Sequence, residues 1–439
     1  MFKETSKELL DFLSKSPTAF HAVENYRQIL NADGFKELLE SEHWDIVPGG
    51  KYYVTRNNTS ILAFKVGTKL DNYSFNIVTS HTDSPTFKVK ENAEIEVKNK
   101  YTQLNTEGYG GMLCATWLDR PLSIAGRVLV SEGNSIVTKL LNIDRDLLMI
   151  PNVAIHMNRA ANDGFKYNLQ VDMLPLLSAG DDRQKDFKQI IADELGVKKE
   201  DILGHDLYLY NRMAPSIWGA NEEFISAGHL DDLQCGFASL KALLAGYNDE
   251  SIDIMACFDN EEVGSGTKQG ADSTLLRDTL TRINSALGKT EEDYHRALAS
   301  SFMLSSDNAH AVHPNHPEHT DATNCTYMNE GVVVKSHAGQ KYTSDGVSMA
   351  VVKALASGAD VPLQYFANRS DMAGGSTLGN IAMAQASMNA VDIGLPQLAM
   401  HSSYETAGIK DTYYAISLMK ALFDSHIQET STHSLEIKR

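Results

Sequence analysis

Hydrophobic residues along this chain follow two different periods. Near the N-terminus they recur every three to four positions, which predicts two short helices on either side of Pro17. After residue 218, short apolar runs alternate with longer helical patterns. The strands predicted in this region are Ile252–Phe258, Phe302–Ser305, Val361–Phe366 and Leu398–Met400. Strands that alternate with helices in this way indicate an α/β fold.

Between residues 86 and 218 the pattern changes to short strands with alternating polar and apolar residues. One acidic helix is predicted among them, near Phe187–Leu195. An all-β block inside an α/β chain is typical of an inserted second domain. We therefore predict a discontinuous main domain, residues 1–85 and 219–439, and a β-rich insert, residues 86–218, whose chain returns near Pro215–Gly219.

Length and charge restrict the partners of the protein. A chain of 439 residues is longer than a single core usually grows, so two domains are expected. The formal net charge of −18 argues against nucleic acid and anionic membranes, because both are negatively charged. No apolar run is long enough to span a bilayer, and the first ten residues carry charges where a signal peptide needs an apolar core. We therefore expect a cytoplasmic protein.

Five groups of residues that can bind metals lie at similar places in the predicted secondary structure. Each group lies at the end of an apolar strand or at the start of a helix. They are His81 with Asp83, Asp231 with Asp232, Glu261 with Glu262, Asp307, and His401. In open α/β sheets, ligands bind beyond the carboxyl ends of the strands, so groups that are remote in sequence can converge. A single group of this kind is usually structural, but five of them predict a site.

Two histidines and several carboxylates in one pocket predict a metal centre. Clustered carboxylates repel one another unless cations compensate, and imidazole with carboxylate oxygen suits zinc, cobalt or manganese. Two divalent ions balance the charges of Asp231, Glu262, Asp307 and one hydroxide. Such a pair of ions activates water for hydrolysis. Of the adjacent glutamates, one can bind metal while the other accepts the proton of the water.

A histidine-rich run begins three residues after Asp307. Its first member, His310, is close enough in sequence to Asp307 to reach a substrate carbonyl or the oxyanion formed from it. Two prolines in the run prevent a helix from aligning the other imidazoles, so we predict an exposed loop for them. These histidines are His313, His316 and His319.

Seven short segments, spread over nearly the whole chain, match one known family. They are SPTAFH (16–21), SHTDSP (80–85), AIHMNR (154–159), HLDD (229–232), FDNEEVGS (258–265), SSDNAHAVHPNH (305–316) and PQLAMHS (396–402). In these segments the chain resembles a bacterial-type member of the aspartyl aminopeptidase family, the family-18 metallo-aminopeptidases. The resemblance implies a three-layer, mixed-sheet zinc-peptidase catalytic domain, an insert used for dimerisation, and a homododecamer.

The resemblance implies five metal ligands and two ions, with zinc preferred and manganese or cobalt as alternatives. One ion is bound by His81 and Asp307, and the other by Glu262 and His401. Asp231 bridges the two ions, and related enzymes carry a cis peptide bond directly after it.

The resemblance also implies four residues that act on the substrate or on the ligands. Glu261 is the general base, His310 polarises the scissile carbonyl, and Asp83 orients His81. His156, which lies in the insert, reaches the active site of a neighbouring subunit.

Substrate preference is the least determined property. Members of this family remove acidic N-terminal residues, but some favour neutral or apolar ones. The negative net charge repels acidic peptides, so an acidic preference needs a local cation, for which Lys335 is the candidate. Gly375 lies in a turn that lets the backbone approach the substrate. The alternatives are a broad or apolar aminopeptidase, a deacylase of N-acyl amino acids with the same metal centre, and a non-catalytic shell.

Overall fold

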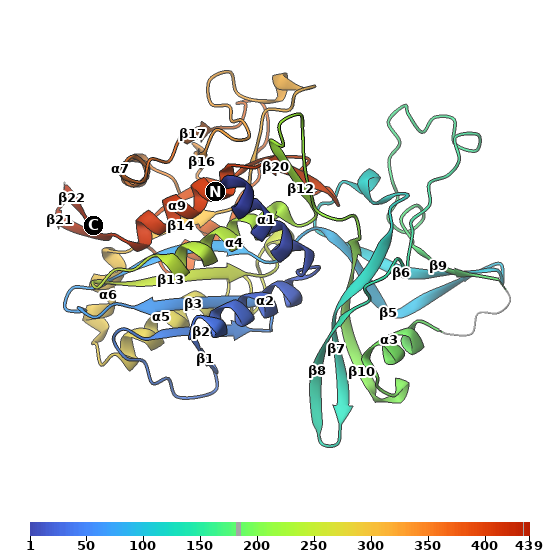
Figure 1. Cartoon of the computed structure of the whole chain (residues 1–439), viewed down its shortest axis with the longest axis horizontal. Helices are drawn as coiled ribbons and strands as arrows, with labels where there is room; N and C mark the ends of the chain where they lie inside the picture. The colour runs from blue at the N-terminus through green and yellow to red at the C-terminus, as the bar shows by residue number, and fades with distance from the viewer. Residues whose placement is uncertain (181–185, 433) are drawn as a thin grey trace.

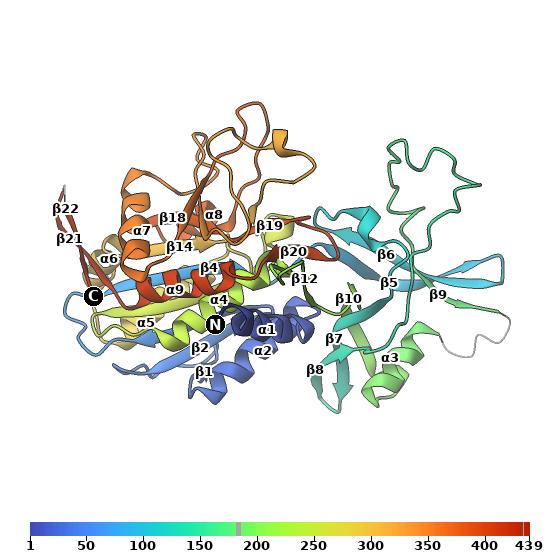
Figure 2. The same cartoon turned by 45° about the horizontal axis from the view of Figure 1, so that its top comes forward.

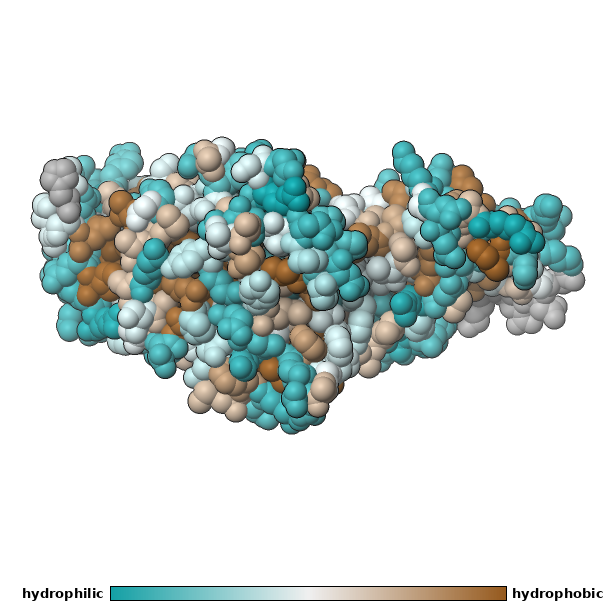
Figure 3. Space-filling model, turned by 90° about the horizontal axis from the view of Figure 1, so that it is seen from above, coloured by the Kyte–Doolittle hydropathy of each residue, from teal (hydrophilic) through white to brown (hydrophobic). Residues whose placement is uncertain are grey.

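The computed structural model describes residues 1–180, 186–432 and 434–439, and it divides into two parts that lie side by side (Figure 1). The larger part contains both termini and a central sheet with helices on both faces (Figures 1 and 2). The smaller part is a separate sheet that carries one α-helix among its described residues. Figure 3 shows a broad lobe and a smaller lobe joined through a narrower region, so the molecule is elongated.

The larger part is built on a nine-stranded mixed sheet with the order β1-β2-β3-β13-β4-β14-β18-β16-β17. Its middle strands β13, β4 and β14 run parallel, whereas β3 is antiparallel to β13 and β16 to β18. The strands are β1 Lys36–Leu38, β2 Lys51–Arg56, β3 Ser60–Val66, β4 Ser74–His81, β13 Ser251–Phe258, β14 Phe302–Ser306, β16 Val332–Lys335, β17 Leu363–Phe366 and β18 Asn389–Gly394.

Helices cover both faces of this sheet, which makes the three-layer α/β fold that the resemblance implies. Every residue of β13 is buried, and successive side chains enter different cores: Met255 faces α4, whereas Ile254 faces α5. One face carries α1 Phe2–Ser14, α2 Ala19–Ala32, α4 Leu230–Ala245, α7 Gly346–Ala359 and α9 Asp411–Phe423. The other face carries α5 Leu275–Ala286, α6 Glu291–Ala299 and α8 Leu378–Gln385.

The smaller part is a six-stranded antiparallel sheet with the order β8-β7-β10-β5-β6-β9 and a core of its own. Its helix α3 spans Phe187–Leu195, the range predicted from the sequence. The strands are β5 Thr86–Val97, β6 Tyr101–Tyr109, β7 Leu122–Glu132, β8 Ser135–Asn142, β9 Leu176–Ala179 and β10 Ile202–Asn211.

A third sheet of five strands lies against the larger part, and the region predicted as the return of the chain contributes its first strand. The strands, in spatial order, are β11 Ser216–Trp218, β12 Phe224–Ala227, β20 Glu405–Gly408, β19 Pro396–Leu398 and β15 Ala309–His310. A two-stranded hairpin, β21 His426–Ser431 and β22 Ser434–Lys438, completes the described chain. No helix among the described residues is long and apolar enough to cross a membrane.

Two predicted strands have different boundaries in the structure. The strand predicted to end at Met400 ends at Leu398, because Ala399 and His401 have φ angles of 55° and 67° in the left-handed region. The strand predicted to start at Val361 starts at Leu363, after Pro362, which has no backbone N–H for strand pairing.

Candidate metal centre

Three neighbouring parallel strands bring the predicted site residues to one edge of the sheet. His81 is the last residue of β4, and Glu261 and Glu262 follow β13 in a short 3-10 turn, Glu261–Val263. Asp307 follows β14 on the other side of β4. Because parallel strands end at the same edge, the four side chains lie close together although more than 200 residues separate the first from the last.

Asp231 lies between the two predicted histidines. His81 Nε2 is 3.6 Å from Asp231 Oδ1 and 4.0 Å from Asp307 Oδ1. On the other side, His401 Nε2 is 3.4 Å from Asp231 Oδ2 and 3.3 Å from Glu262 Oε2. The peptide bond after Asp231 is cis, as the resemblance implies. The structure therefore brings together all five residues predicted as metal ligands, in two groups that share Asp231.

Both imidazoles are oriented by a backbone carbonyl. His81 Nδ1 lies 3.0 Å from the carbonyl oxygen of Asp83, and His401 Nδ1 lies 3.0 Å from that of Gly111. A proton on Nδ1 that is donated to the carbonyl leaves Nε2 free, and both Nε2 atoms face Asp231. His401 therefore depends on the inserted sheet for its orientation, because Gly111 belongs to the segment after β6.

The charges of this cluster fit divalent cations. Among the described residues, the buried oxygens Asp231 Oδ1 and Glu262 Oε1 have no hydrogen-bond partner. Burial and the neighbouring Asp231 raise the pKa of Glu262 well above its ordinary range. Burial alone would raise the pKa of Asp231 too, but His401 and His81 hold it below its usual value. Unpartnered carboxylate oxygens beside two free imidazole nitrogens are the donor set that zinc binds.

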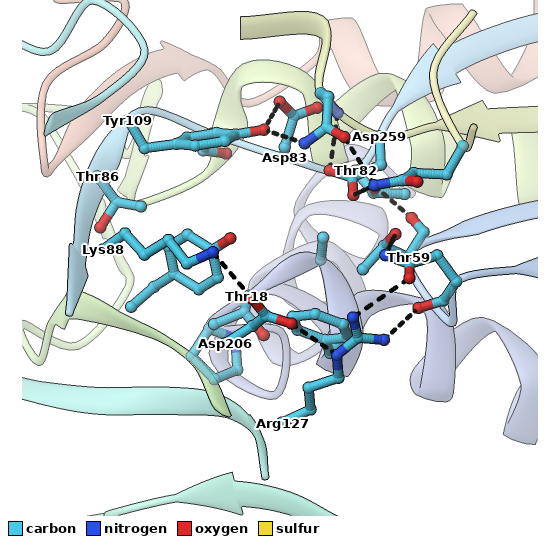
Figure 4. A pocket seen from close by; sticks show the side chains of 18 of the residues that line it. Thr18, Thr59, Thr82, Asp83, Thr86, Lys88, Tyr109, Arg127, Asp206 and Asp259 are labelled. Carbon is cyan, nitrogen blue, oxygen red and sulfur yellow. Dashed lines mark hydrogen bonds and ion pairs between the residues drawn. The ribbon is translucent and has the colours of Figure 1, made fainter. Parts of the chain in front are cut away.

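Asp83 holds the turn that carries the two glutamates. Its carboxylate accepts hydrogen bonds from the backbone N–H of Glu261 at 3.1 Å and of Glu262 at 3.2 Å. It also accepts one from the Tyr109 hydroxyl at 2.6 Å, which Figure 4 shows pointing at Asp83 from β6. Burial, followed by the charges of Asp307 and Asp83, raises the pKa of Glu261 to about 7. Asp83 therefore positions Glu261 and Glu262 as well as His81.

Tyr109→Phe should lower kcat about tenfold without releasing bound metal, because it removes one of the three groups that fix the Asp83 carboxylate. Tyr208→Phe is the matched control, since its ring packs edge-on at 5.8 Å against Tyr109 in the same cavity. Steady-state kinetics and metal analysis check this expectation. Equal kcat values for the two variants would contradict the positioning role.

A cavity of about 350 Å³, lined by Asp83 among others, lies between the inserted sheet and the larger part (Figure 4). Arg127 of β7 crosses this junction: it donates to Asp206 Oδ2 at 2.8 Å and to the carbonyl of Asn57 at 3.0 Å. Its guanidinium also lies 4.8 Å from the centre of the Phe20 ring. These contacts fix the inserted sheet against the turn between β2 and β3 and against α2.

A second cavity of about 280 Å³ lies between the segments that follow Asp307 and precede His401. His310 and the predicted Gly375 both line it, and the Phe366 ring lies 6.1 Å from that of His310. Arg369, which the sequence interpretation did not include, also lines this cavity and forms an ion pair with Asp371 at 2.7 Å.

Lys335 is not on the surface but lies directly beneath the cluster. Its side chain is 4% exposed, and Nζ is 2.8 Å from the Asn308 carbonyl and 3.7 Å from Asp307 Oδ2. Burial by itself lowers the pKa of Lys335, but the nearby Asp307, Tyr342 and Asp392 raise this pKa above its ordinary value, so the ammonium group is charged. His156, in contrast, is exposed in an irregular segment of the insert.

Glu405 is a further residue of the site that the sequence interpretation missed. It is buried, and it accepts hydrogen bonds from the backbone N–H of His401 at 2.8 Å and of Asp231 at 3.0 Å. One side chain thus joins the segment of His401 to that of Asp231. The signal in the sequence was weak, because a lone glutamate four residues after a histidine is usually exposed.

Comparison with known proteins gives one consistent result. Residues 12–423 match the family model described as aminopeptidase I zinc metalloprotease (M18). The chain is 48% identical over 425 residues to a probable M18 family aminopeptidase 2 of Clostridium novyi (strain NT), covering 95% of this chain and 98% of that protein. Among solved structures, the Ape4 and Nbr1 complex gives a TM-score of 0.93 at 35% identity, covering 96% of this chain and 86% of that chain. The S. cerevisiae mApe1 dodecamer gives a TM-score of 0.84 at 28% identity, covering 96% of this chain and 97% of that chain.

Proposed function

This chain belongs to the M18 family of aminopeptidase I zinc metalloproteases, and we propose that it uses two divalent ions to remove acidic N-terminal residues from peptides. Metal-dependent aminopeptidase activity, a hydrolase reaction, follows from the family; the number of ions and the acidic preference are the proposal. The observation that supports two ions is the position of Asp231, whose two carboxylate oxygens face two different histidines.

In this proposal, His81 and Asp307 would hold one ion and Glu262 and His401 the second, with Asp231 available to both. Zinc is the preferred ion, with manganese or cobalt as alternatives, since imidazole and carboxylate suit all three. Bound divalent ions supply a Lewis acid that polarises the scissile carbonyl and makes water a better nucleophile.

The protein residues move the protons and position the substrate. Glu261 accepts the proton of the attacking water and then donates it to the leaving amine. Its partner in the turn, Glu262, points instead at His401. His310 lines the cavity beside Asp307 and donates a hydrogen bond to the oxyanion of the substrate.

The acidic preference depends on a cation near the substrate cavity. Two cations are close to it: buried Lys335 beneath Asp307, and Arg369 in the cavity wall. Both cations have a carboxylate partner, Lys335 at 3.7 Å from Asp307 and Arg369 at 2.7 Å from Asp371. We assign the role to Lys335, because its charge is buried and therefore acts more strongly on an added carboxylate than the more exposed guanidinium of Arg369. Gly375 leaves room for the backbone of the substrate.

Lys335→Met should lower the ratio of kcat/KM for Asp- over Leu-substrates by roughly 10–100-fold, because it removes a buried charge partner. Arg369→Gln is the matched control and should leave the ratio unchanged. The measurement is turnover of Asp-, Glu-, Leu- and N-acetyl-amino-acid substrates with added zinc, manganese or cobalt. Preferred turnover of Leu substrates by the unmodified enzyme would favour the broad-specificity alternative, and turnover of acetylated substrates would favour the deacylase.

We further propose that residues 86–218 form a dimerisation domain and that dimers assemble into a cytoplasmic dodecamer. A related structure is named as a dodecamer. The segment around His156 supports an interface, because it exposes Val153, Ile155, Met157 and Val171. A sedimentation mass near that of a single chain would contradict the assembly.

His156→Ala should lower activity while leaving bound metal unchanged, since in this proposal the imidazole reaches the substrate of a neighbouring subunit. The checks are kinetics, metal analysis and sedimentation of the same preparation. A fall in metal content would instead make His156 a ligand or a folding determinant.

A further inference from the structure

The histidine-rich loop after β15 brings three ligand atoms together outside the metal centre. His316 Nδ1 is 3.1 Å and His319 Nε2 is 3.6 Å from the same oxygen, Glu318 Oε1. The two imidazole rings are stacked, with centres 5.2 Å apart and an angle of 9° between their planes. The loop is exposed, as predicted from the sequence, but its imidazoles are aligned, because Pro317 begins a 3-10 turn, Pro317–His319.

The spacing of these atoms is similar to that of the proposed zinc ligands in the same chain. The His–carboxylate distances there are 3.3 Å for His401–Glu262, 3.4 Å for His401–Asp231, 3.6 Å for His81–Asp231 and 4.0 Å for His81–Asp307. Ligands at about 2.0–2.1 Å from a tetrahedral zinc ion are roughly 3.3–3.4 Å apart. A single ion can contact all three loop atoms once the stacked imidazole rings rotate so that each nitrogen points at it, and side chains that are 57–59% exposed are free to do so.

We propose that His316, Glu318 and His319 form a third, exchangeable zinc site, separate from the catalytic pair. Two imidazoles and a carboxylate select zinc and similar transition metals over magnesium, which prefers oxygen ligands. Structural zinc sites are usually closed by four protein ligands, whereas this site supplies three and leaves room for solvent. Such a site binds and releases its ion without unfolding the chain.

The position of the site connects it to the substrate cavity. His319 and His313 line that cavity together with Arg369, and Arg369 donates a hydrogen bond to the backbone carbonyl of Glu318. An ion on the loop therefore fixes one wall of the cavity against the segment that carries Arg369 and Gly375. Bound zinc at this site restricts entry of substrate and raises KM.

The test is calorimetric titration of zinc into the full-length enzyme whose catalytic centre is already loaded with zinc. The wild-type enzyme should show one additional binding event per chain. The double variant His316→Gln, Glu318→Gln should lack that event and keep its catalytic zinc. Magnesium, titrated in the same way, should give no event.

His43→Gln is the matched control, since His43 is also exposed and lies 3.8 Å from the carboxylate of Asp45 without a second imidazole beside it. It should retain the additional event. The proposal is overturned if the wild-type enzyme shows no such event, if the double variant keeps it, or if His43→Gln also loses it. Excess zinc should raise KM for the wild-type enzyme but not for the double variant, and an equal response would overturn the link to the cavity. These outcomes do not depend on whether the enzyme prefers acidic N-terminal residues, so this test can fail or succeed independently of the proposed specificity.

Discussion

Glu261→Gln should lower kcat by about 10²–10⁴-fold while both ions stay bound, because proton transfer by a positioned carboxylate contributes this much to catalysis. The turn that carries Glu261 is held by Asp83 through two backbone N–H groups, so the amide side chain keeps the same position. The measurements are single-turnover kinetics and metal content by elemental analysis.

The adjacent residue provides the control for this prediction. Glu262→Gln is the same chemical change one residue away, but Glu262 Oε2 lies 3.3 Å from His401 Nε2, so this variant should lose metal. Near wild-type turnover in Glu261→Gln would remove Glu261 from the role of general base. Equal metal loss in both variants would show that the two carboxylates share one function.

Asp231→Asn should lower both metal content and activity, the latter by about 10³-fold or more, because bound metal supplies several kcal/mol of transition-state stabilisation. Asp231 is the one residue that the two ligand groups share, so its neutralisation weakens both. The amide replaces one of the two oxygens by a donor, which cannot bind a cation. Elemental analysis after dialysis at limiting zinc, followed by kinetics, checks this.

Asp253→Asn is the matched control. Asp253 is as buried as Asp231 and lies on β13, in the sheet that carries His81. Burial raises the pKa of Asp253 well above its usual value, so an amide resembles the neutral form of this side chain. Its side chain accepts a hydrogen bond from Asn76 at 3.1 Å, near the start of β4 and away from His81. This variant should keep both ions. Loss of one ion only in Asp231→Asn would show that Asp231 does not contact both.

The convergence of His81, Glu261 and Asp307 could be predicted because their positions follow from local rules. His81 ends, and Glu261 and Asp307 follow, a run of apolar residues typical of a buried strand, and parallel strands end at one edge. The family resemblance then supplied the roles. It also identified His401, although the strand before it ends two residues earlier than its apolar pattern predicted.

The residues that support the site could not be predicted in this way. Tyr109 binds Asp83 from 26 residues away, Gly111 binds His401 from 290 residues away, and Glu405 binds Asp231 from 174 residues away. Hydrogen bonds between such remote segments have no sequence signature. The sequence interpretation gave the insert a role in dimerisation and, through His156, in the active site of a neighbouring subunit, but none in the site of its own chain. The structure places its β6 segment against Asp83, Glu262 and His401, so the insert also contributes to the candidate metal centre of the same chain.

Sequence alone determined the α/β alternation, the β-rich block and the five residues that we propose as metal ligands, because hydrophobic period and residue chemistry are local properties. Only the tertiary structure decided which atoms meet: that Asp231 stands between two histidines, that Lys335 is buried beneath Asp307, and that the loop imidazoles align on Glu318. The physical reason is that contacts between remote segments depend on strand order, side-chain direction and backbone angles, which the linear pattern of residues does not contain.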